Sequence, residues 1–137
     1  KLVLPLDTIC GKEFKEDTPT MTAEGNIPDG WEGFDIGPKT VELFKNLVVN
    51  AKTIVWNGPL GVFEMKPFAN GTFSLAQTIA DATAKGAVSV IGGGDSASAI
   101  KKAGLNKAMT HISTGGGASL EFMEGKGFET LDILDNK

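Results

Sequence analysis

The sequence contains no arginine, and all 13 of its basic residues are lysine. The missing arginine matters because enzymes that move phosphoryl groups usually place a guanidinium or a lysine beside the developing negative charge. If this chain handles phosphate, it must therefore use backbone amides, its lysines, a metal ion or groups that belong to another segment.

Cysteine is nearly as scarce, since Cys10 is the one example in 137 residues. A single cysteine excludes an internal disulfide framework and makes a reducing cytoplasm the expected compartment. Because no histidine or basic side chain adjoins Cys10 to lower the pKa of its thiol, we interpret it as a half-buried structural residue.

Long apolar runs and clusters of positive charge are also missing. No stretch approaches the roughly 18 apolar residues that a membrane-spanning helix needs, and no secretory signal is visible. The net charge is −4 and no polybasic run occurs, which argues against nucleic acid or an anionic membrane as the partner. The length of 137 residues fits one ordinary domain with a sizeable core.

The first residues form an apolar run, Leu2-Val3-Leu4-Pro5-Leu6-Asp7, of the kind that lies buried between other strands. Because a domain seldom begins with its own core, we expect a fragment whose earlier strands and helices lie upstream. Residues 8–22 alternate loosely around Gly11 and Pro19, which predicts a small antiparallel excursion. Residues 27–38 are rich in turn-forming residues and predict a loop wrapped around a short strand.

Helical and strand-like patterns alternate through the remainder of the chain. Helices are predicted over residues 38–50, 72–85, around 99–103 and from about 118 to 124, and strands over residues 53–56, 87–91 and 108–112. Strands that alternate with helices through short connections favour right-handed crossovers and a parallel sheet covered on both faces. We therefore predict an α/β fold with three layers, α/β/α, around a mainly parallel, Rossmann-like sheet.

The chain is organised around Gly92-Gly93-Gly94-Asp95-Ser96, which follows a predicted strand and opens a helix. Glycines let the backbone approach a ligand closely, and the free N–H groups at a helix N-terminus favour phosphate. A carboxylate in such a loop repels a polyphosphate unless a cation lies between them, so Asp95 suggests Mg²⁺ carried with a nucleotide. A plain tight turn with Asp95 or Ser96 as the helix N-cap is the alternative.

Two more glycine-rich loops follow predicted strands, over residues 57–64 and 113–117. In a parallel sheet the loops after successive strands emerge at the same carboxyl edge, where open α/β sheets bind their ligands. The three loops together therefore predict one cleft for a nucleotide or a phosphate. Glu64 has two oxygens suited to a ribose diol, and a solvated loop carboxylate is the alternative.

Neither standard nucleotide signature applies. Residues 92–97 fit the spacing of the dinucleotide fingerprint, but His111 and a glycine-rich run stand where that fingerprint needs an acid. Neither Gly-Lys pair has the earlier glycine of a Walker loop.

We interpret His111 as a hydrogen-bonded structural side chain, and Trp31 and Trp56 as core or pocket wall. Residues 128–137 suit either an edge strand or a segment that docks on another domain.

Four segments carry a family resemblance when they are taken together. They are Asp35-Ile36-Gly37-Pro38-Lys39-Thr40, Val55-Trp56-Asn57-Gly58-Pro59-Leu60-Gly61-Val62-Phe63-Glu64, Gly92-Gly93-Gly94-Asp95-Ser96-Ala97 and His111-Ile112-Ser113-Thr114-Gly115-Gly116-Gly117-Ala118-Ser119-Leu120-Glu121. In order and spacing they resemble the carboxyl-terminal domain of phosphoglycerate kinase, over nearly the whole chain. The resemblance implies that residues 1–137 are part of the nucleotide-binding domain of a two-domain, monomeric, cytoplasmic enzyme.

The family enzyme carries phosphoryl between 1,3-bisphosphoglycerate and MgADP, giving 3-phosphoglycerate and MgATP in glycolysis. Matched motif by motif, the resemblance implies that Gly33 lines the nucleotide pocket, Asn57 and Pro59 border the base, and Glu64 binds the ribose hydroxyls. It also implies that Gly93, Gly94 and Ser96 contact the phosphates and that Asp95 holds Mg²⁺. The N–H donors to the phosphoryl group in transit would be Gly115, Gly116 and Gly117.

Two parts of the family pattern are missing from the chain. They are the amino-terminal domain, which binds phosphoglycerate with histidines and arginines, and the early nucleotide-domain segment, which supplies catalytic lysines and a glycine pair beside the adenine. We therefore expect this polypeptide by itself to bind MgATP or MgADP weakly and not to turn over. A free-standing, non-catalytic nucleotide-binding or interaction module is the alternative.

Overall fold

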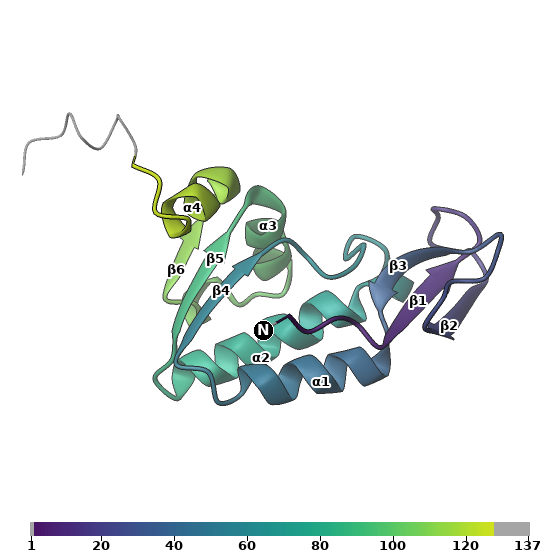
Figure 1. Ribbon diagram of the computed structural model, residues 1–137, viewed down its shortest axis with the longest axis horizontal. Coiled ribbons are helices and arrows are strands. Elements are labelled where there is room, and N and C mark those ends of the chain that lie inside the picture. The colour runs from purple at the N-terminus through teal and green to yellow at the C-terminus, as the bar shows by residue number, and fades with distance from the viewer. Residues whose placement is uncertain (1, 128–137) are drawn as a thin grey trace, which may run out of the picture.

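The computed structural model describes residues 2–127, which form two small sheets joined by two long helices (Figure 1). The first sheet is antiparallel and contains β1 (Asp7–Gly11), β2 (Thr20–Glu24) and β3 (Glu32–Ile36) in the order β2-β1-β3. The antiparallel excursion and the short strand predicted within residues 27–38 are therefore confirmed. They belong to one sheet, because β3 pairs with the other side of β1.

The second sheet is parallel and contains β4 (Thr53–Asn57), β5 (Val88–Gly92) and β6 (His111–Ser113) in the order β4-β5-β6. Its strands follow the predicted ones closely except at β6. There the strand begins only at His111, because Ala108 ends a 3₁₀ turn over Asn106–Ala108 and the next two residues form a bend.

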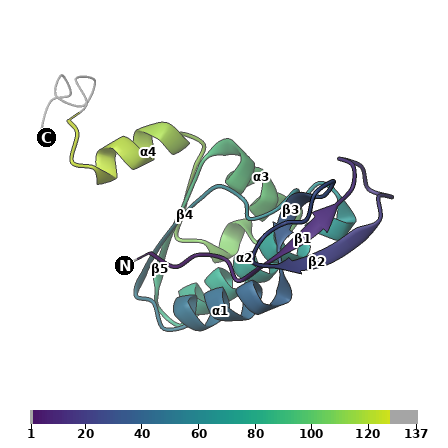
Figure 2. The same cartoon turned by 45° about the vertical axis from the view of Figure 1, so that its right-hand side comes forward.

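Four α-helices connect and cover these strands. They are α1 (Pro38–Val48), α2 (Asn70–Ala84), α3 (Gly94–Lys102) and α4 (Gly116–Met123), and a 3₁₀ turn over Lys66–Phe68 precedes α2. In Figure 1, α1 and α2 run side by side from one sheet to the other, and α4 lies at the end of the molecule farthest from the antiparallel sheet, as it also does in Figure 2. No helix in the described part of the chain has the length and apolar character needed to cross a membrane.

One face of the parallel sheet forms the main hydrophobic core with α2 and α3. Trp56 of β4 is only 6% exposed, and Ile79, Ile91 and Ile100 are almost completely buried beside it. Trp56 therefore lies in the core as predicted, whereas Trp31 is half-buried near the ammonium of Lys12, which is 5.3 Å from its ring centroid.

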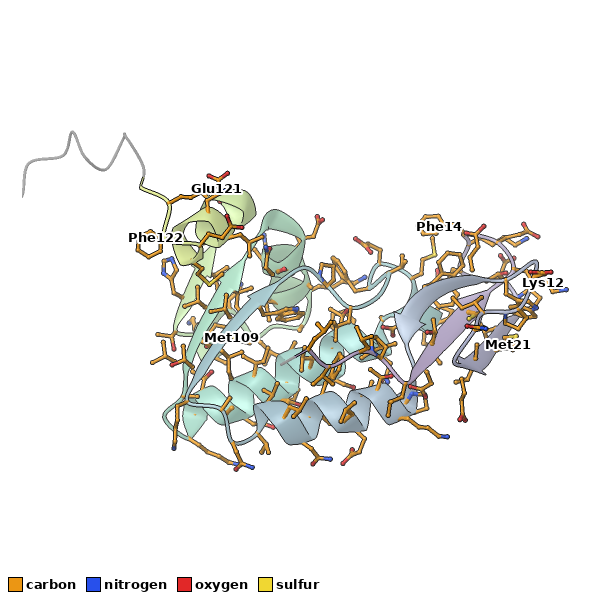
Figure 3. All side chains as sticks on the ribbon, viewed as in Figure 1. Lys12, Phe14, Met21, Met109, Glu121 and Phe122 are labelled. Carbon is orange, nitrogen blue, oxygen red and sulfur yellow. The ribbon has the colours of Figure 1, made fainter. Side chains whose placement is uncertain are left out.

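The opposite face of this sheet is partly exposed, so the prediction that helices cover both faces is wrong. Val55 and Val88 on that face are 44% and 47% exposed. The helix α4, which Phe122 marks in Figure 3, lies at the upper end of the sheet, and an apolar pocket separates it from Val55 and Val90. Within residues 2–127 the parallel sheet is therefore three strands wide and incompletely layered, and the small antiparallel sheet stands apart from it.

The apolar run at the beginning of the chain is not the buried strand that its composition predicts. Leu2 is 84% and Leu4 is 64% exposed, and the first strand begins only at Asp7. Burial of such a run requires neighbouring strands on both sides, and none of the described residues pairs with it.

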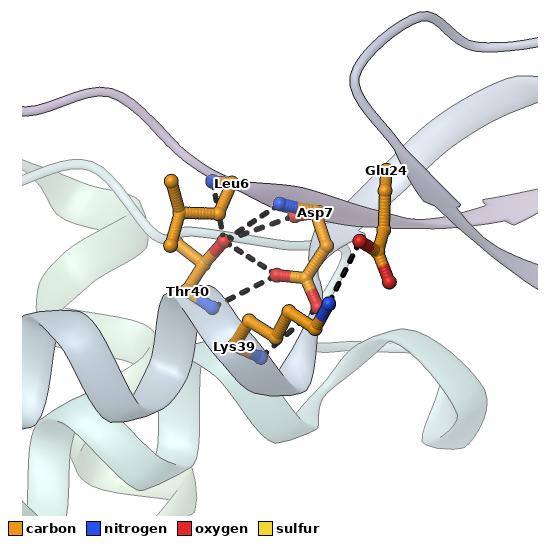
Figure 4. Close-up of polar contacts among 5 residues, drawn as sticks. All are labelled: Leu6, Asp7, Glu24, Lys39 and Thr40. Atoms are coloured by element: carbon orange, nitrogen blue, oxygen red, sulfur yellow. Dashed lines mark hydrogen bonds and ion pairs between the residues drawn. The ribbon is translucent and has the colours of Figure 1, made fainter.

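A buried carboxylate holds the antiparallel sheet to α1 (Figure 4). One oxygen of Asp7 accepts hydrogen bonds from the backbone N–H of Thr40 (2.8 Å) and from its hydroxyl (2.6 Å), and the other accepts the N–H of Lys39 (3.0 Å). Burial opposes ionisation of Asp7, yet these hydrogen bonds hold its pKa below the ordinary value. Asp7 thus satisfies the first N–H groups of a helix that Pro38 begins and that has no N-cap side chain of its own.

Cys10 is completely buried in β1, more deeply than predicted. Burial raises the pKa of its thiol, and its sulfur lies 3.7 Å from the carbonyl oxygen of Thr8. Both features agree with a structural role, because reactivity requires an accessible thiolate. The alternatives for residues 128–137 concern a segment outside the described residues.

Candidate functional site at the carboxyl edge of the parallel sheet

The three glycine-rich loops leave the parallel sheet at one edge. The register pairs Asn57 with Gly92 and Gly92 with Ser113, so the last residues of β4, β5 and β6 lie side by side. This arrangement follows from the parallel connections alone, as the sequence predicts.

The loops also touch one another. A methyl group on Gly116 would lie 2.9 Å from the Cα of Gly93 and 3.0 Å from Oδ1 of Asn57, so no side chain fits there. Gly93 has a φ of +93°, which favours glycine, and its N–H donates to the carbonyl oxygen of Ser113 at 3.0 Å. Residues of three strand-following loops therefore meet around one point.

Ser96 joins two of these loops through a hydrogen bond. Its side chain is completely buried in the first turn of α3, and its Oγ accepts the N–H of Gly58 at 2.7 Å. The N-cap of α3 is Gly93, without a side-chain cap, so the alternative that Asp95 or Ser96 caps the helix is wrong.

The space in front of the loops is open to a ligand. Methyl groups on Gly94 and Gly117 would meet no atom within 4 Å, and the side chain of Asp95 is exposed beside Gly94. The N-termini of α3 and α4 both begin at this edge, and helix N-termini favour negative charge.

The donor set at this edge suits a magnesium nucleotide better than a metal held by protein alone. Among residues 2–127 no group of three or more His, Cys, Asp or Glu side chains could hold a metal ion. Mg²⁺ is commonly bound through one or two carboxylates together with substrate phosphates and waters. An exposed Asp95 in the first turn of α3, beside open backbone N–H groups, fits that pattern.

The loop after β4 lies between two hollows of the surface. Gly33 and Pro59 line one cleft of about 310 Å³. Glu64 lines a separate cleft of about 470 Å³ together with Phe63 and Lys102. The structure thus brings Gly33 and Pro59 together, but leaves Asn57, also assigned to the base, outside the lining of that cleft and places Glu64 in a neighbouring hollow.

Buried polar side chains fix the shape of this loop, and sequence reasoning assigned them no role. Thr72, completely buried in α2, accepts the N–H groups of Leu60 and Gly61, each at 3.1 Å. The N–H of Val62 donates to the carbonyl oxygen of Phe34 in β3 at 2.8 Å. Each of these hydrogen bonds joins residues more than ten positions apart, so no short-range sequence pattern predicts it.

Asp35 is the second buried acid that sequence reasoning missed. It is 3% exposed at the end of β3, and its oxygens accept the N–H groups of Ile36 (2.8 Å) and Gly71 (2.7 Å). Burial raises the pKa of Asp35 to about 6, although both hydrogen bonds favour the charged form. A methyl group on Gly61 would overlap the Asp35 carboxylate, so this acid lies directly behind the loop. The one available signal was an acid placed between the apolar residues Phe34 and Ile36.

His111 corrects another expectation. Its side chain is exposed and makes no hydrogen bond to the residues that the structure describes, so it is not a satisfied core histidine. It lines an apolar pocket of about 700 Å³ between the sheet and α4, together with Val55, Val90 and Met123. Gly115 reaches this pocket, whereas Gly116 and Gly117 lie outside its lining.

Comparison with known proteins gives a consistent result. The family model described as phosphoglycerate kinase matches residues 1–126. The phosphoglycerate kinase of Oenococcus oeni is 53% identical over 137 residues, which is 100% of this chain and 34% of that protein. That of Thermosipho africanus is 54% identical over 139 residues and is covered to 35%.

Solved structures agree with the sequence comparison. The structure of phosphoglycerate kinase from Coxiella burnetii matches with a TM-score of 0.82 and 43% identity, over 90% of this chain and 31% of that chain. The enzyme from Pyrococcus horikoshii OT3 matches with a TM-score of 0.75 and 35% identity, over 93% and 31%. The chain spans about a third of the length of these relatives. On this sequence and structural similarity, the chain belongs to the phosphoglycerate kinase family.

Proposed function

We propose that this chain is the nucleotide-binding part of a phosphoglycerate kinase and holds MgADP or MgATP at the carboxyl edge of its parallel sheet. The observation that carries the proposal is the meeting of Asn57, Gly93 and Gly116 at one point, with open space before Gly94 and Gly117. Loops that merely turned the chain would not need to exclude side chains from the same contact.

The proposed roles use the two hollows beside the loop after β4. Gly33 and Pro59 take the base in the cleft they share, and Glu64, in the neighbouring cleft, accepts hydrogen bonds from the ribose hydroxyls. Asn57, which the resemblance assigns to the base, lies against Gly93 and Gly116, so in this proposal it borders the base from the side of the phosphate loops. The carboxylate of Glu64 is exposed and makes no hydrogen bond or ion pair to residues 2–127, so its oxygens are available to a diol.

The phosphates lie in this proposal before the N-termini of α3 and α4. The turn of Gly93, Gly94 and Ser96 holds the nucleotide phosphates through the N–H groups at the start of α3, while the N–H of Gly93 itself donates to the carbonyl oxygen of Ser113. At the start of α4 the N–H groups of Gly116 and Gly117 face the phosphoryl group in transit, and Gly115, whose N–H donates to Ser113 Oγ, shapes that turn. Asp95 would hold Mg²⁺, which neutralises phosphate charge when it is bound. Because these donors are fixed by the fold, they need no rearrangement as charge develops.

In the proposed reaction, the phosphoryl group leaves the carboxyl oxygen of 1,3-bisphosphoglycerate and bonds to a terminal oxygen of ADP, giving 3-phosphoglycerate and ATP. The family resemblance implies that the amino-terminal domain binds the phosphoglycerate, which agrees with the lack of arginine in this acidic chain. We expect that complete enzyme to be a cytoplasmic monomer that acts in glycolysis, and the 137-residue chain alone to be inactive.

Calorimetric titration of the 137-residue chain with MgADP tests the nucleotide site. Substitution Glu64→Ala or Asp95→Ala should weaken binding about tenfold or more, because each removes hydrogen bonds or coordination by a charged group. Glu42→Ala is the matched control, since Glu42 is an exposed acid of α1. Unchanged affinity in both site variants, or no detectable binding by the wild-type chain, would overturn the site.

A chimera separates the two functional hypotheses. In it, this chain replaces the matching third of the Oenococcus oeni enzyme, to which it is 53% identical. A coupled ATP-formation assay should show activity in the chimera, loss of activity with Asp95→Ala, and none in the isolated chain. A folded chimera that binds MgADP but forms no ATP would instead support a non-catalytic nucleotide-binding module.

A further inference from the structure

The loop of residues 57–64 is hydrogen-bonded to both ends of the same helix, α3. At the first turn of α3, Ser96 Oγ accepts the N–H of Gly58 at 2.7 Å. In the last turn, the ammonium of Lys102 donates to the carbonyl oxygens of Phe63 (3.1 Å) and Glu64 (3.3 Å). These two hydrogen-bonded contacts lie at opposite ends of the loop.

The ammonium of Lys102 is held in place by more than one contact. It lies 5.8 Å from the ring centroid of Phe63, a side chain that is buried against Ala69 and Ala99. A cation over an aromatic face is attracted to the ring, and a buried ring does not move away from it. Lys102 therefore bonds to a backbone segment whose neighbouring ring is already fixed by packing.

Lys102 contacts the backbone of Glu64 and leaves its carboxylate free. The structure shows no ion pair between Lys102 and the Glu64 side chain, nor any other hydrogen bond to that carboxylate, within residues 2–127. A lysine that neutralised the carboxylate would compete with a ligand for it. One that holds only the carbonyl fixes where the carboxylate starts without occupying its oxygens.

We infer that Lys102 is a positioning residue that sets the place of Glu64 relative to the phosphate loop, so that one nucleotide can reach both. This inference rests on the proposed nucleotide site. The nine residues of α3 rise about 13 Å between its ends. Because Ser96 and Lys102 belong to the same rigid helix, the phosphate side and the ribose side of the site keep a fixed separation.

The test compares MgADP with the magnesium complex of 2′,3′-dideoxy-ADP, which lacks the ribose diol. In the 137-residue chain, Lys102→Met should weaken MgADP binding about tenfold, within the range of coupling between neighbouring residues of one network, and leave the dideoxy compound unaffected. Lys101→Met is the matched control, because Lys101 is exposed on the same turn and makes no side-chain hydrogen bond or ion pair to the described residues. It should change neither affinity.

A double variant gives a second readout. If Lys102 acts through Glu64, then Glu64→Ala combined with Lys102→Met should bind MgADP no more weakly than Glu64→Ala alone. Additive losses, equal losses for both nucleotides, or no loss with Lys102→Met would each overturn the inference. If Glu64→Ala itself has no effect, the proposed ribose contact fails instead.

Amide hydrogen exchange of the nucleotide-free chain tests the contact independently of any ligand. Lys102→Met should speed exchange in residues 62–66 relative to Lys101→Met, because the end of the loop loses its hydrogen bonds to the ammonium of Lys102. Circular dichroism confirms that both variants are folded. Equal exchange in the two variants would overturn the holding role even if MgADP does not bind.

Discussion

Asp35 is expected to make this chain more stable in weak acid than at pH 8. Burial raises its pKa in the folded chain to about 6, against the ordinary value of 3.8, although the N–H groups of Gly71 and Ile36 favour its charged form. The folded chain therefore takes up a proton before the unfolded chain does. This contribution to stability is complete below pH 3.8 and is lost as the pH rises through about 6.

The size of the effect follows from the two pKa values. The gap between 3.8 and about 6 corresponds to about 3 kcal/mol at the acid limit. Between pH 8 and pH 5 the linkage relation gives about 1 kcal/mol, because the carboxyl of the folded chain is mostly protonated at pH 5. Asp7 does not interfere in this range, since its pKa lies below the ordinary value.

Urea unfolding followed by tryptophan fluorescence measures this effect, because Trp56 lies in the core. The control is Asp35→Asn, which cannot titrate and which loses an acceptor for one of the two N–H groups. The unpaired N–H group should cost the variant about 1–3 kcal/mol, and this part of the difference does not change with pH. The free energy of unfolding of the wild type, minus that of Asp35→Asn, should rise by about 1 kcal/mol from pH 8 to pH 5.

A difference that stays flat, or that falls toward pH 5, would refute the reasoning. Such a result would mean that the N–H groups of Ile36 and Gly71 stabilise the carboxylate more than burial destabilises it. The pH dependence of the wild type alone does not decide the matter, because every other titratable group contributes equally to both proteins.

Three further predictions concern stability, each measured by thermal or urea unfolding. Thr72→Val should cost about 1–3 kcal/mol by stranding two buried loop amides, whereas Thr72→Ser should cost much less; equal losses would contradict the hydrogen-bond account. Asp7→Ala should cost about 2 kcal/mol near neutral pH by uncapping α1, a difference that shrinks below pH 3.8 as the wild-type carboxylate protonates. Gly116→Ala should cost about 1–3 kcal/mol because its methyl would press on Gly93, while Gly117→Ala, which meets nothing within 4 Å, should be neutral or slightly stabilising.

Much of the local structure could be read from the sequence. Pro38 and the apolar spacing behind it predict α1, and the alternation of strand and helix patterns predicts that β4, β5 and β6 run parallel. That order alone brings the three glycine-rich loops to one edge. These features depend on short-range periodicity and backbone freedom, which are properties of adjacent residues.

The tertiary structure decided which surfaces are covered and which side chains hold the loops. The apolar runs at Leu2–Leu6 and along Val55 and Val88 show a preference for burial, but that preference cannot supply the neighbour that would bury them. Lys102 and Phe63 lie 39 positions apart, and Asp35 and Gly71 lie 36 apart. Such contacts exist only once the chain has packed, because no periodic pattern links residues so far apart in sequence.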